Sequence, residues 1–292
     1  MTDGSWGISL NGLDLTGVVG QATFKALDVE NWAAGPGSTG DSIQNQYGDG
    51  GWVNEAFDTD KRLIIPGTIK GPDRESVRSG FDLLNSLIPR KDLRPLVVDE
   101  DGLVRHTLVR LDQPRPDFKY LSDRLGSFTI QLVAPRGRKL AGDGSGPTTL
   151  AGPVGLPKVE GGLRLVPPGV RYVPGGVRIV ATVRSGQIVL GTAGNATPPV
   201  LLRIRGPIPD FTITATLGDT IQVQRYTEAV PAGQFVDIDL DKRLVRINGT
   251  VSRRNKLIGP WITPADGMTF KFESSAQNDT ASMELFASSA WR

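Results

Sequence analysis

The strongest constraint on this fold comes from short segments in which apolar and polar residues alternate, each ended by a turn with glycine or proline. Near the middle of the chain, Phe128, Ile130 and Leu132 are separated by single residues. This is the period of a strand with one buried face. Similar segments recur throughout, and the 36 glycines and 21 prolines can supply many turns. The sequence therefore predicts a mainly β protein.

One segment has the period of a helix instead. Asp73 is a suitable N-cap, and Pro89 prevents continuation beyond the preceding residue. Apolar residues at spacings of four, three and four form one face between them: Val77, Phe81, Leu84 and Ile88. We expect this helix to pack on a sheet, which makes the first half a β-rich α+β unit, a barrel or sandwich with one helix.

The strands expected in the first half are Trp6–Leu10, 18–24, a pair within 53–69 interrupted at Pro66-Gly67, 95–98, Leu103–Leu111 and the strand around Phe128. Asn11-Gly12 and Asp101-Gly102 are hairpin turn signals. The second half contains only strand and turn patterns. Its expected strands are 177–184, 200–205, 211–217, 220–226, 234–240, 243–247, 268–272 and 282–287. Regular strand spacing without a helix predicts a jelly-roll β-sandwich.

A Gly/Pro-rich stretch, AGDGSGPTTLAGPVG from residue 141, follows the basic residues Arg136, Arg138 and Lys139. Its composition is expected to prevent any regular element. We therefore predict an N-terminal domain over 1–140, a linker and approach over 141–175 and a C-terminal sandwich over 176–292.

Residues 29–51 form a polar, glycine-rich stretch flanked by Trp32 and Trp52. A loop or extended arm of this length in a compact domain usually has a function, so we expect a contact surface here. The candidate assembly-interface residues are Trp32, Ile43, Tyr47, Trp52, Arg136 and Arg138.

The composition limits the available chemistry. With 33 basic and 31 acidic residues, no net field favours nucleic acid or a membrane surface. The chain has no cysteine and one histidine, His106, which argues against thiolate nucleophiles and zinc sites. No apolar run approaches the roughly 20 residues that span a bilayer, and the N-terminus lacks a signal-peptide pattern. We expect a soluble protein without a secretion signal, membrane insertion, metal or cofactor.

Several motifs match a functional pattern only superficially. Gly35, Gly37 and Gly40 match G-x-G-x-x-G, but neither a preceding strand nor a following helix is predicted. No Gly-Lys pair exists for a P-loop. The run at Asp237, Asp239 and Asp241 resembles the start of a calcium loop but lacks its glycine and glutamate, which favours a solvated acidic ladder.

Other candidate residues have structural interpretations that are favoured. His106 lies mid-strand, where a structural or surface histidine is more probable than a triad member. Arg253, Arg254 and Lys256 lack interleaved aromatic residues, so a solvated loop is favoured over a nucleic-acid site. A glycosidase needs two carboxylates, and a carbohydrate-binding module would use a surface tryptophan; both alternatives stay open. Their candidates are Asp58, Asp60, Asp99 and Glu100 for the first, and Trp261 and Trp291 for the second.

The order of these features resembles the distal tail protein family of bacteriophages with long, non-contractile tails. The matching stretches are FDTDKRLIIPGTIKGPDRESVRSGFDLLNSLI, RPLVVDEDGLVRHTLVRL and FTIQLVAPRGRKL in the first half, and LGTAGNATPPVLLRIRGPI, VDIDLDKRLVRINGT and GPWITPADGMTFKFE in the second. The resemblance implies a ring-forming N-terminal domain followed by a galectin-like sandwich.

The same resemblance implies a non-catalytic structural protein of the virion, located at the tail tip. Six copies would form a ring that joins the tail tube to the tip or baseplate proteins and leaves a channel for passing DNA. The implied partners are further copies of the chain, the tail tube protein, and tail-tip proteins such as a tail-associated lysin or fibre. The alternative is a carbohydrate-binding module or a glycosidase accessory that acts on the host cell surface.

Overall fold

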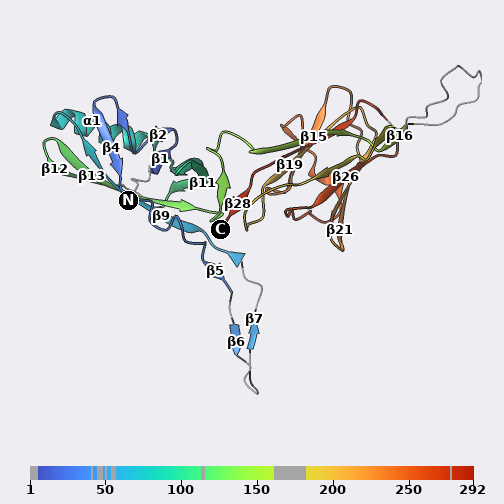
Figure 1. The fold of residues 1–292 in the computed structure, drawn as a ribbon, viewed down its shortest axis with the longest axis horizontal. Helices are drawn as coiled ribbons and strands as arrows, with labels where there is room; N and C mark the ends of the chain where they lie inside the picture. Colours follow the sequence, from blue (N-terminus) through green and yellow to red (C-terminus); the bar gives the residue numbers. More distant parts are fainter. Residues whose placement is uncertain are drawn as a thin grey trace, which may run out of the picture. The chain divides into compact units, whose positions relative to one another are not determined.

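The computed structural model describes residues 6–40, 42–44, 49, 51–53, 57–112, 116–160, 182–276 and 278–292. The chain divides into two compact units (Figure 1). Unit 1 comprises Met1–Gly146, Gly194–Ala196 and Ala290–Arg292, and unit 2 comprises Pro147–Ala193 and Thr197–Ser289. Each unit has its own cluster of buried apolar side chains.

Unit 1 is built on an 11-stranded antiparallel sheet that is nearly closed into a barrel. Its main path runs β2-β1-β10-β11-β13-β9-β4-β3, with β12 on β13, and β14 on β11 and β28. The strands are β1 Trp6–Leu10, β2 Leu13–Asp14, β3 Val18–Val19, β4 Ala22–Ala26, β9 Lys61–Lys70, β10 Arg94–Glu100, β11 Leu103–Leu111, β12 Asp117–Ser122, β13 Leu125–Ala134, β14 Lys139–Ala141 and β28 Ala290–Trp291. Leu15 links the two ends of the path, because its N–H donates to Ile8 O over 2.8 Å and its carbonyl accepts from Ala26 N over 2.7 Å.

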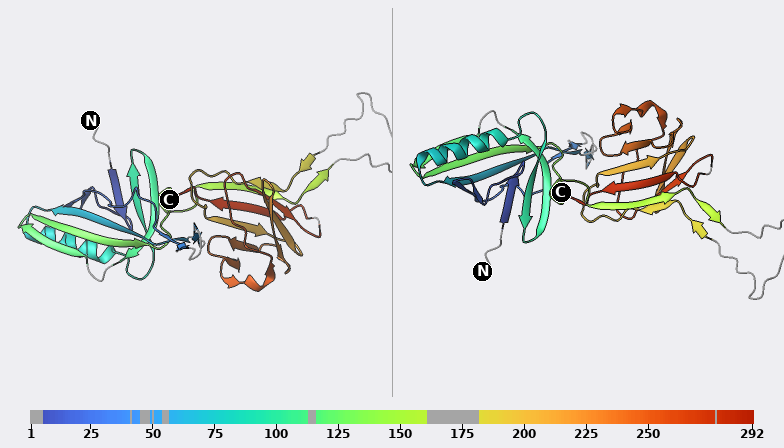
Figure 2. Two further views of the ribbon diagram at one scale, coloured as in Figure 1. Left: turned by 90° about the horizontal axis from the view of Figure 1, so that it is seen from below. Right: turned by 90° about the horizontal axis from the view of Figure 1, so that it is seen from above.

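The single α-helix of the described residues, α1 (Arg74–Leu87), covers one side of this sheet (Figure 2). The Asp73 side chain caps it by accepting from Ser76 N over 2.8 Å. All four residues of the predicted apolar face are buried: Val77, Phe81, Leu84 and Ile88. The helix therefore begins, ends and packs as its sequence predicts. Close approach to the sheet needs small residues, because a Cβ on Gly126 would meet the Phe81 ring at 2.3 Å.

The Pro66-Gly67 pair does not interrupt its strand, and this prediction is wrong. β9 runs unbroken through both residues and pairs with β13 over its whole length. The Pro66 carbonyl accepts from Leu27 N over 2.9 Å, on the side where β4 ends. Since N and O of one strand residue point the same way, the missing N–H of Pro66 costs no bond to β13. Gly67 leaves room for the ring of Phe128, whose Cζ lies 2.3 Å from the position of an added Cβ.

Two further expectations about strands are corrected. The segment expected as one strand over 18–24 is two short strands, β3 and β4, separated by a turn in which Gly20 has a φ of 63°. The Gly/Pro-rich stretch does contain regular structure, namely β14 and β15 (Thr149–Gly155). β15 is an edge strand that is hydrogen-bonded only to β27 among the described strands, and its register shifts between Ala151 and Val154. An edge strand with a bulge tolerates Pro153 there.

Unit 2 is a sandwich of two antiparallel sheets around a common core (Figures 1 and 2). The six-stranded sheet has the order β15-β27-β19-β22-β23-β24, and the five-stranded sheet has the order β18-β26-β20-β21-β25. The strands are β18 Gln187–Val189, β19 Val200–Arg205, β20 Phe211–Leu217, β21 Thr220–Tyr226, β22 Phe235–Asp239, β23 Leu244–Ile247, β24 Val251–Ser252, β25 Leu257–Ile258, β26 Thr269–Glu273 and β27 Ser282–Ala287. A separate hairpin pairs β16 (Lys158–Glu160) with β17 (Thr182–Arg184), and a 3-10 helix, η1, spans Arg254–Lys256. Most of the strand expected over 177–184 lies outside the described residues. The predicted fold class, a helix-bearing β unit followed by a β-sandwich, is confirmed.

Replacing Gly67 by alanine should destabilise unit 1, because the new methyl group would overlap the Phe128 ring. Overpacking of this kind costs about 1–3 kcal/mol. Hydrogen exchange of the full chain should show faster opening of the β9 and β13 amides in Gly67→Ala. Gly35→Ala is the matched control, because an added Cβ there meets no atom within 4 Å. Equal exchange in both variants would contradict this account of β9.

Candidate assembly surface at the root of the arm

The polar stretch that follows Trp32 contains a two-stranded arm that leaves the sheet of unit 1 (Figure 1). β5 (Ser38–Thr39) pairs with β8 (Phe57–Asp58), and β6 (Ser42–Gln44) pairs with β7 (Gly51–Val53). Residues 38–58 are called the arm below, and residues 32–37 and 59–61 its root. The stretch expected as a glycine-rich loop or arm thus contains two pairs of short strands, and β9 follows directly after β8.

Trp32 belongs to the core of unit 1 and does not lie on the surface of the arm. It is 2% exposed, and its buried Nε1 has no acceptor among the described residues. This burial corrects the expectation that Trp32 presents its side chain to a partner. The residue instead anchors the root of the arm in the apolar core, so the direction of the arm is tied to the packing of the unit.

Two buried lysines hold this root. Lys61 Nζ donates to the Trp32 carbonyl over 2.8 Å and also to the Ala34 carbonyl. Lys139 Nζ donates to the same Trp32 carbonyl over 3.1 Å and lies 5.8 Å from the centre of the Trp32 ring. Both lysines are nearly inaccessible, at 5% and 6% exposure. One backbone oxygen therefore accepts from two ammonium groups.

Burial and repulsion by nearby positive charges lower the pKa of both lysines. Burial, with the Lys139 charge as the second cause, lowers the pKa of Lys61 to about 8. Burial also lowers the pKa of Lys139, and nearby Arg105 lowers it further, against the opposing effect of Glu100. No carboxylate of the described residues forms an ion pair with Lys61. The root is therefore held by hydrogen bonds from two ammonium groups to backbone carbonyls.

The turn between β13 and β14 packs against the same root. Gly137 has a φ of 61°, and an added Cβ there would lie 2.6 Å from Pro36 and 3.0 Å from the Thr59 carbonyl. Arg136 is exposed and Arg138 half-buried on either side of this glycine. The fold thus brings two of the predicted interface residues, distant in sequence from the arm, to its root. Ile43 and Trp52 are paired neighbours across β6 and β7, but their side chains and all of Tyr47 lie outside the described residues.

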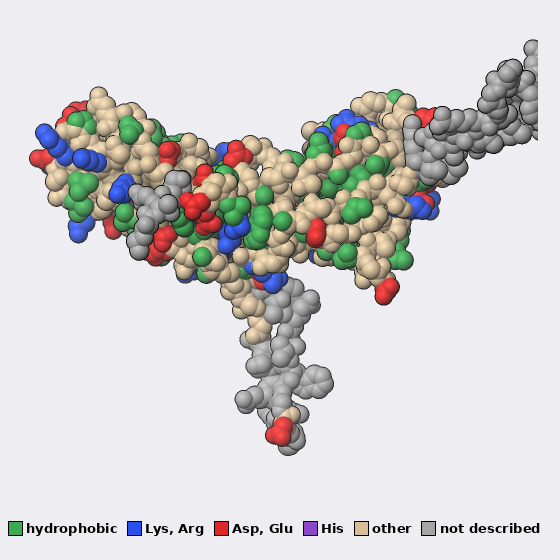
Figure 3. Space-filling view, in the orientation of Figure 1, with side chains coloured by type: hydrophobic (Ala, Val, Ile, Leu, Met, Phe, Trp, Pro, Cys, Tyr) green, Lys and Arg blue, Asp and Glu red, His purple; other side chains and the backbone are tan. Residues whose placement is uncertain are grey.

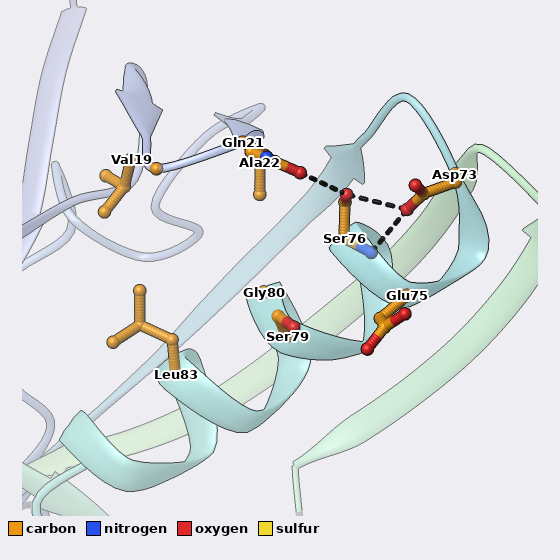
Figure 4. A pocket seen from close by; sticks show the side chains of 10 residues that line it. Val19, Gln21, Ala22, Asp73, Glu75, Ser76, Ser79, Gly80 and Leu83 are labelled. Atoms are coloured by element: carbon orange, nitrogen blue, oxygen red, sulfur yellow. Dashed lines mark hydrogen bonds between the residues drawn. The ribbon is translucent and has the colours of Figure 1, made fainter.

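A pocket of about 410 Å³ lies beside the first two turns of α1 (Figure 4). Its walls come from the β3–β4 turn and the helix, and they include Val19, Gln21, Glu75 and Leu83. The Ser76 hydroxyl donates to Asp73 over 2.7 Å and lies 3.1 Å from Gln21 Oε1. These contacts secure the helix start to the β3–β4 turn, and the polar groups serve the fold.

Several of the residues tested for catalysis or metal binding have structural partners. His106 is buried, and its Nδ1 lies 2.8 Å from the Gly142 carbonyl. Asp99 accepts from Gly102 N over 2.7 Å in its hairpin turn, and Asp58 pairs with Arg292 at 3.2 Å. Within the described ranges, no group of three or more His, Cys, Asp or Glu side chains is arranged to hold a metal ion. The G-x-G-x-x-G match leads into the arm and not into a helix.

The candidate residues of unit 2 are also engaged. Asp237 binds Arg203 through two bonds, of 2.7 and 3.0 Å, and Asp239 accepts from Lys242 N over 2.8 Å. Two residues of the basic cluster are paired as well, since Arg253 lies 2.9 Å from Glu228 and the Arg254 guanidinium lies 4.6 Å from the Trp261 ring centre. In unit 1, Arg105 lies 4.4 Å from the Trp291 ring centre.

This chain is similar to known proteins in its structure. No protein-family model matches the sequence, and no curated protein matches it. The crystal structure of the Dit protein of SPP1, described as a paradigm of the hub adsorption apparatus of phages that infect Gram-positive bacteria, superposes with a TM-score of 0.65 at 11% identity. The match covers 99% of this chain and 100% of that one. The chain has a Dit-like fold. Chains of two phage p2 baseplate structures are also similar. The first has a TM-score of 0.48 at 12% identity, with coverage of 96% of this chain and 96% of that chain. The second has a TM-score of 0.45 at 14% identity, with coverage of 94% of this chain and 99% of that chain.

Basic, acidic and hydrophobic side chains are interspersed over the face of the molecule seen in Figure 3, in line with the nearly balanced charge of the sequence. No helix in the described part is long and apolar enough to cross a membrane.

Sequence reasoning missed Lys61 and Lys139. Lys61 lies at a position where the alternation of β9 places it toward the interior, which is a sequence signal for a buried lysine. Lys139 has no such signal, because β14 is three residues long and does not alternate. Their shared acceptor, the carbonyl of Trp32, is a backbone atom and leaves no trace in a sequence motif.

The lowered pKa of Lys61 predicts that the stability of unit 1 rises with pH. Between about pH 8 and the ordinary lysine value of 10.5, the native state binds fewer protons than the unfolded state. The free energy of unfolding therefore increases with pH across this window. Lys61→Met should reduce this increase, as seen in urea midpoints of the full chain at pH 7.5 and 9.5, and the part that remains comes from Lys139, whose pKa is also lowered. Lys70→Met, at the exposed end of the same strand, should keep the wild-type slope; a Lys61→Met chain with an unchanged slope would refute the assignment.

Proposed function

We propose that this chain is a structural hub protein of a phage tail. In this proposal, copies of it form a ring that joins the tail tube to the tip or baseplate proteins and surrounds the channel for DNA. The main support for this proposal is that the structural similarity to SPP1 Dit extends through both units and covers 99% of the chain. A shared sandwich alone would be weak support, because such folds serve many functions.

The architecture of unit 1 suits this role. A ring needs one surface of each copy to meet a different surface of the next copy. The arm offers such a surface, and the buried root at Trp32 fixes its origin. Unit 1 also exposes apolar side chains, Val18 at 71% and Leu27 at 64%, of the kind that assembly covers.

We propose no catalytic activity, because the fold that the chain resembles is that of a hub protein. Three of the candidate acids also have structural contacts, Asp58 with Arg292, Asp99 with Gly102 N and Glu100 with Arg105. The proposed partners are other copies of this chain, the tail tube protein and tail-tip proteins such as a lysin or fibre, with DNA as passing cargo. The proposed location is the tail tip of the virion. In this proposal, the N-terminal domain forms the ring and the sandwich is displayed outward.

Native mass spectrometry of the purified chain should detect a hexamer, and electron microscopy of the same sample should show closed rings. The physical reason is that a heterologous contact that closes by rotation gives a finite ring. A chain that stays monomeric at all concentrations would contradict the proposed ring. Open filaments would show that the contact exists without closure.

Trp52→Ala should shift the equilibrium from ring toward monomer. Buried interface tryptophans are frequent hot spots, and losing one costs about 2 kcal/mol or more, roughly thirtyfold in dissociation constant. Trp6→Ala is the matched control, since Trp6 is a half-exposed tryptophan of the same unit outside the arm. Analytical ultracentrifugation of both variants measures the shift. If both variants assemble like the wild type, the arm is not the contact.

A further inference from the structure

The outer face of the six-stranded sheet in unit 2 presents two parallel rows of side chains. The first, called the apolar row, crosses five strands as the paired neighbours Leu150, Phe286, Leu201, Asp239 and Leu244. The second, called the charged row, crosses four strands as Glu284, Arg203, Asp237 and Arg246. Neighbouring strands lie about 4.8 Å apart, so both rows have this repeat.

The charged row is held rigidly. Arg203 and Asp237 form the bidentate pair described above, and Arg205 lies 3.1 Å from Glu284. The Arg203 guanidinium also lies 4.4 Å from the ring centre of Phe235 and 5.5 Å from that of Phe286. A bidentate pair stacked on two aromatic rings loses little entropy when a ligand binds, because it is already ordered.

The face is hollowed along the apolar row. One hollow of about 190 Å³ includes Phe286 in its wall, and a second of about 220 Å³ includes Leu244 and Arg246. Leu201, Asp239 and Lys242 line both. The two hollows are therefore adjacent parts of one shallow trough. Its described lining combines exposed apolar groups with hydrogen-bond donors and acceptors.

The charges of the trough define the chemistry of an occupant. The charged side chains that line the trough nearly balance, with three carboxylates and two cations, namely Asp237, Asp239, Asp241, Lys242 and Arg246. Asp239 pairs with Lys242 at 3.6 Å. Such a surface gives no net attraction to a nucleic acid or an acidic peptide. It does offer both acceptors and donors, including the exposed Arg246, which has no ion pair among the described residues. An uncharged ligand with many hydroxyl groups matches this pattern.

We propose that this trough binds an uncharged saccharide chain. The apolar row contacts the C–H faces of the sugar rings, and the Arg246 guanidinium and the Asp239 carboxylate bond to hydroxyl groups. Such a site has the usual composition of a ligand pocket, an apolar lining with a few fixed polar groups. The shallow trough needs no opening of the sandwich, since its apolar lining is already accessible, with Leu244 36% exposed and Leu201 and Phe286 half-buried.

The test uses the isotopically labelled full chain with cellohexaose, chitohexaose and maltohexaose as probes. Nuclear magnetic resonance should show saturable shifts of the Leu201, Leu244 and Phe286 signals with at least one probe. Leu244→Ser and Arg246→Ala should each weaken that binding about fivefold to tenfold, the effect of one lost contact. Ile221→Ser, on the exposed face of the opposite sheet, is the matched control and should bind like the wild type.

The proposal is overturned if none of the three probes gives saturable shifts at up to roughly 10 mM, well above the weak end of specific affinities. It is also overturned if these signals shift with the concentration of the chain itself, since the occupant is then a second copy. Well-dispersed spectra of each variant establish that it folds. The measurement does not depend on ring formation, so a negative result leaves the proposed hub role intact, and a monomeric chain leaves the saccharide site testable.

Discussion

The pairing of β9 with β13 is the interaction on which unit 1 depends. The two strands are in register from Leu125 opposite Lys70 to Ala134 opposite Lys61. At one end of this ladder, Gly126 allows α1 to pack closely. At the other end, Lys61 leads back to the arm, and β13 leads into the Gly137 turn that packs on its root. A shift of one residue would turn the side chains of one strand to the opposite face and separate all of these contacts.

Much of this arrangement follows from the sequence, and the failures have definite causes. The helix was predictable because its cap, apolar face and stop signal agree. β15 was not, since glycine and proline are compatible with an edge strand as well as with a linker, and only the pairing with β27 distinguishes the two. Pro66 was misleading for the same reason: its effect depends on which neighbour its nitrogen faces, which is a tertiary fact.

The candidate site was less predictable than the fold. The arm was expected from its composition, and Arg136 and Arg138 prove to lie at its root. Trp32 was expected on a surface, but aromatic residues that flank a polar stretch serve equally well as anchors inside the core. The rows of unit 2 were invisible in the sequence, because they run across strands. They join residues that are far apart in the chain, by 34 positions in Arg203–Asp237, 38 in Leu201–Asp239 and 85 in Leu201–Phe286.

The last strand, β28, returns the chain to unit 1 and pairs Lys139 with Trp291. The chain passes between the units after residues 146, 193, 196 and 289, so the sandwich is an insertion in unit 1 and not a tail appended to it. Exchange of the sandwich between related genes would therefore require several matched junctions. A recombination event with a single crossover would remove β28 and leave β14 with an open edge. The modularity of such a protein is thus limited by its strand connections, even where its two cores are independent.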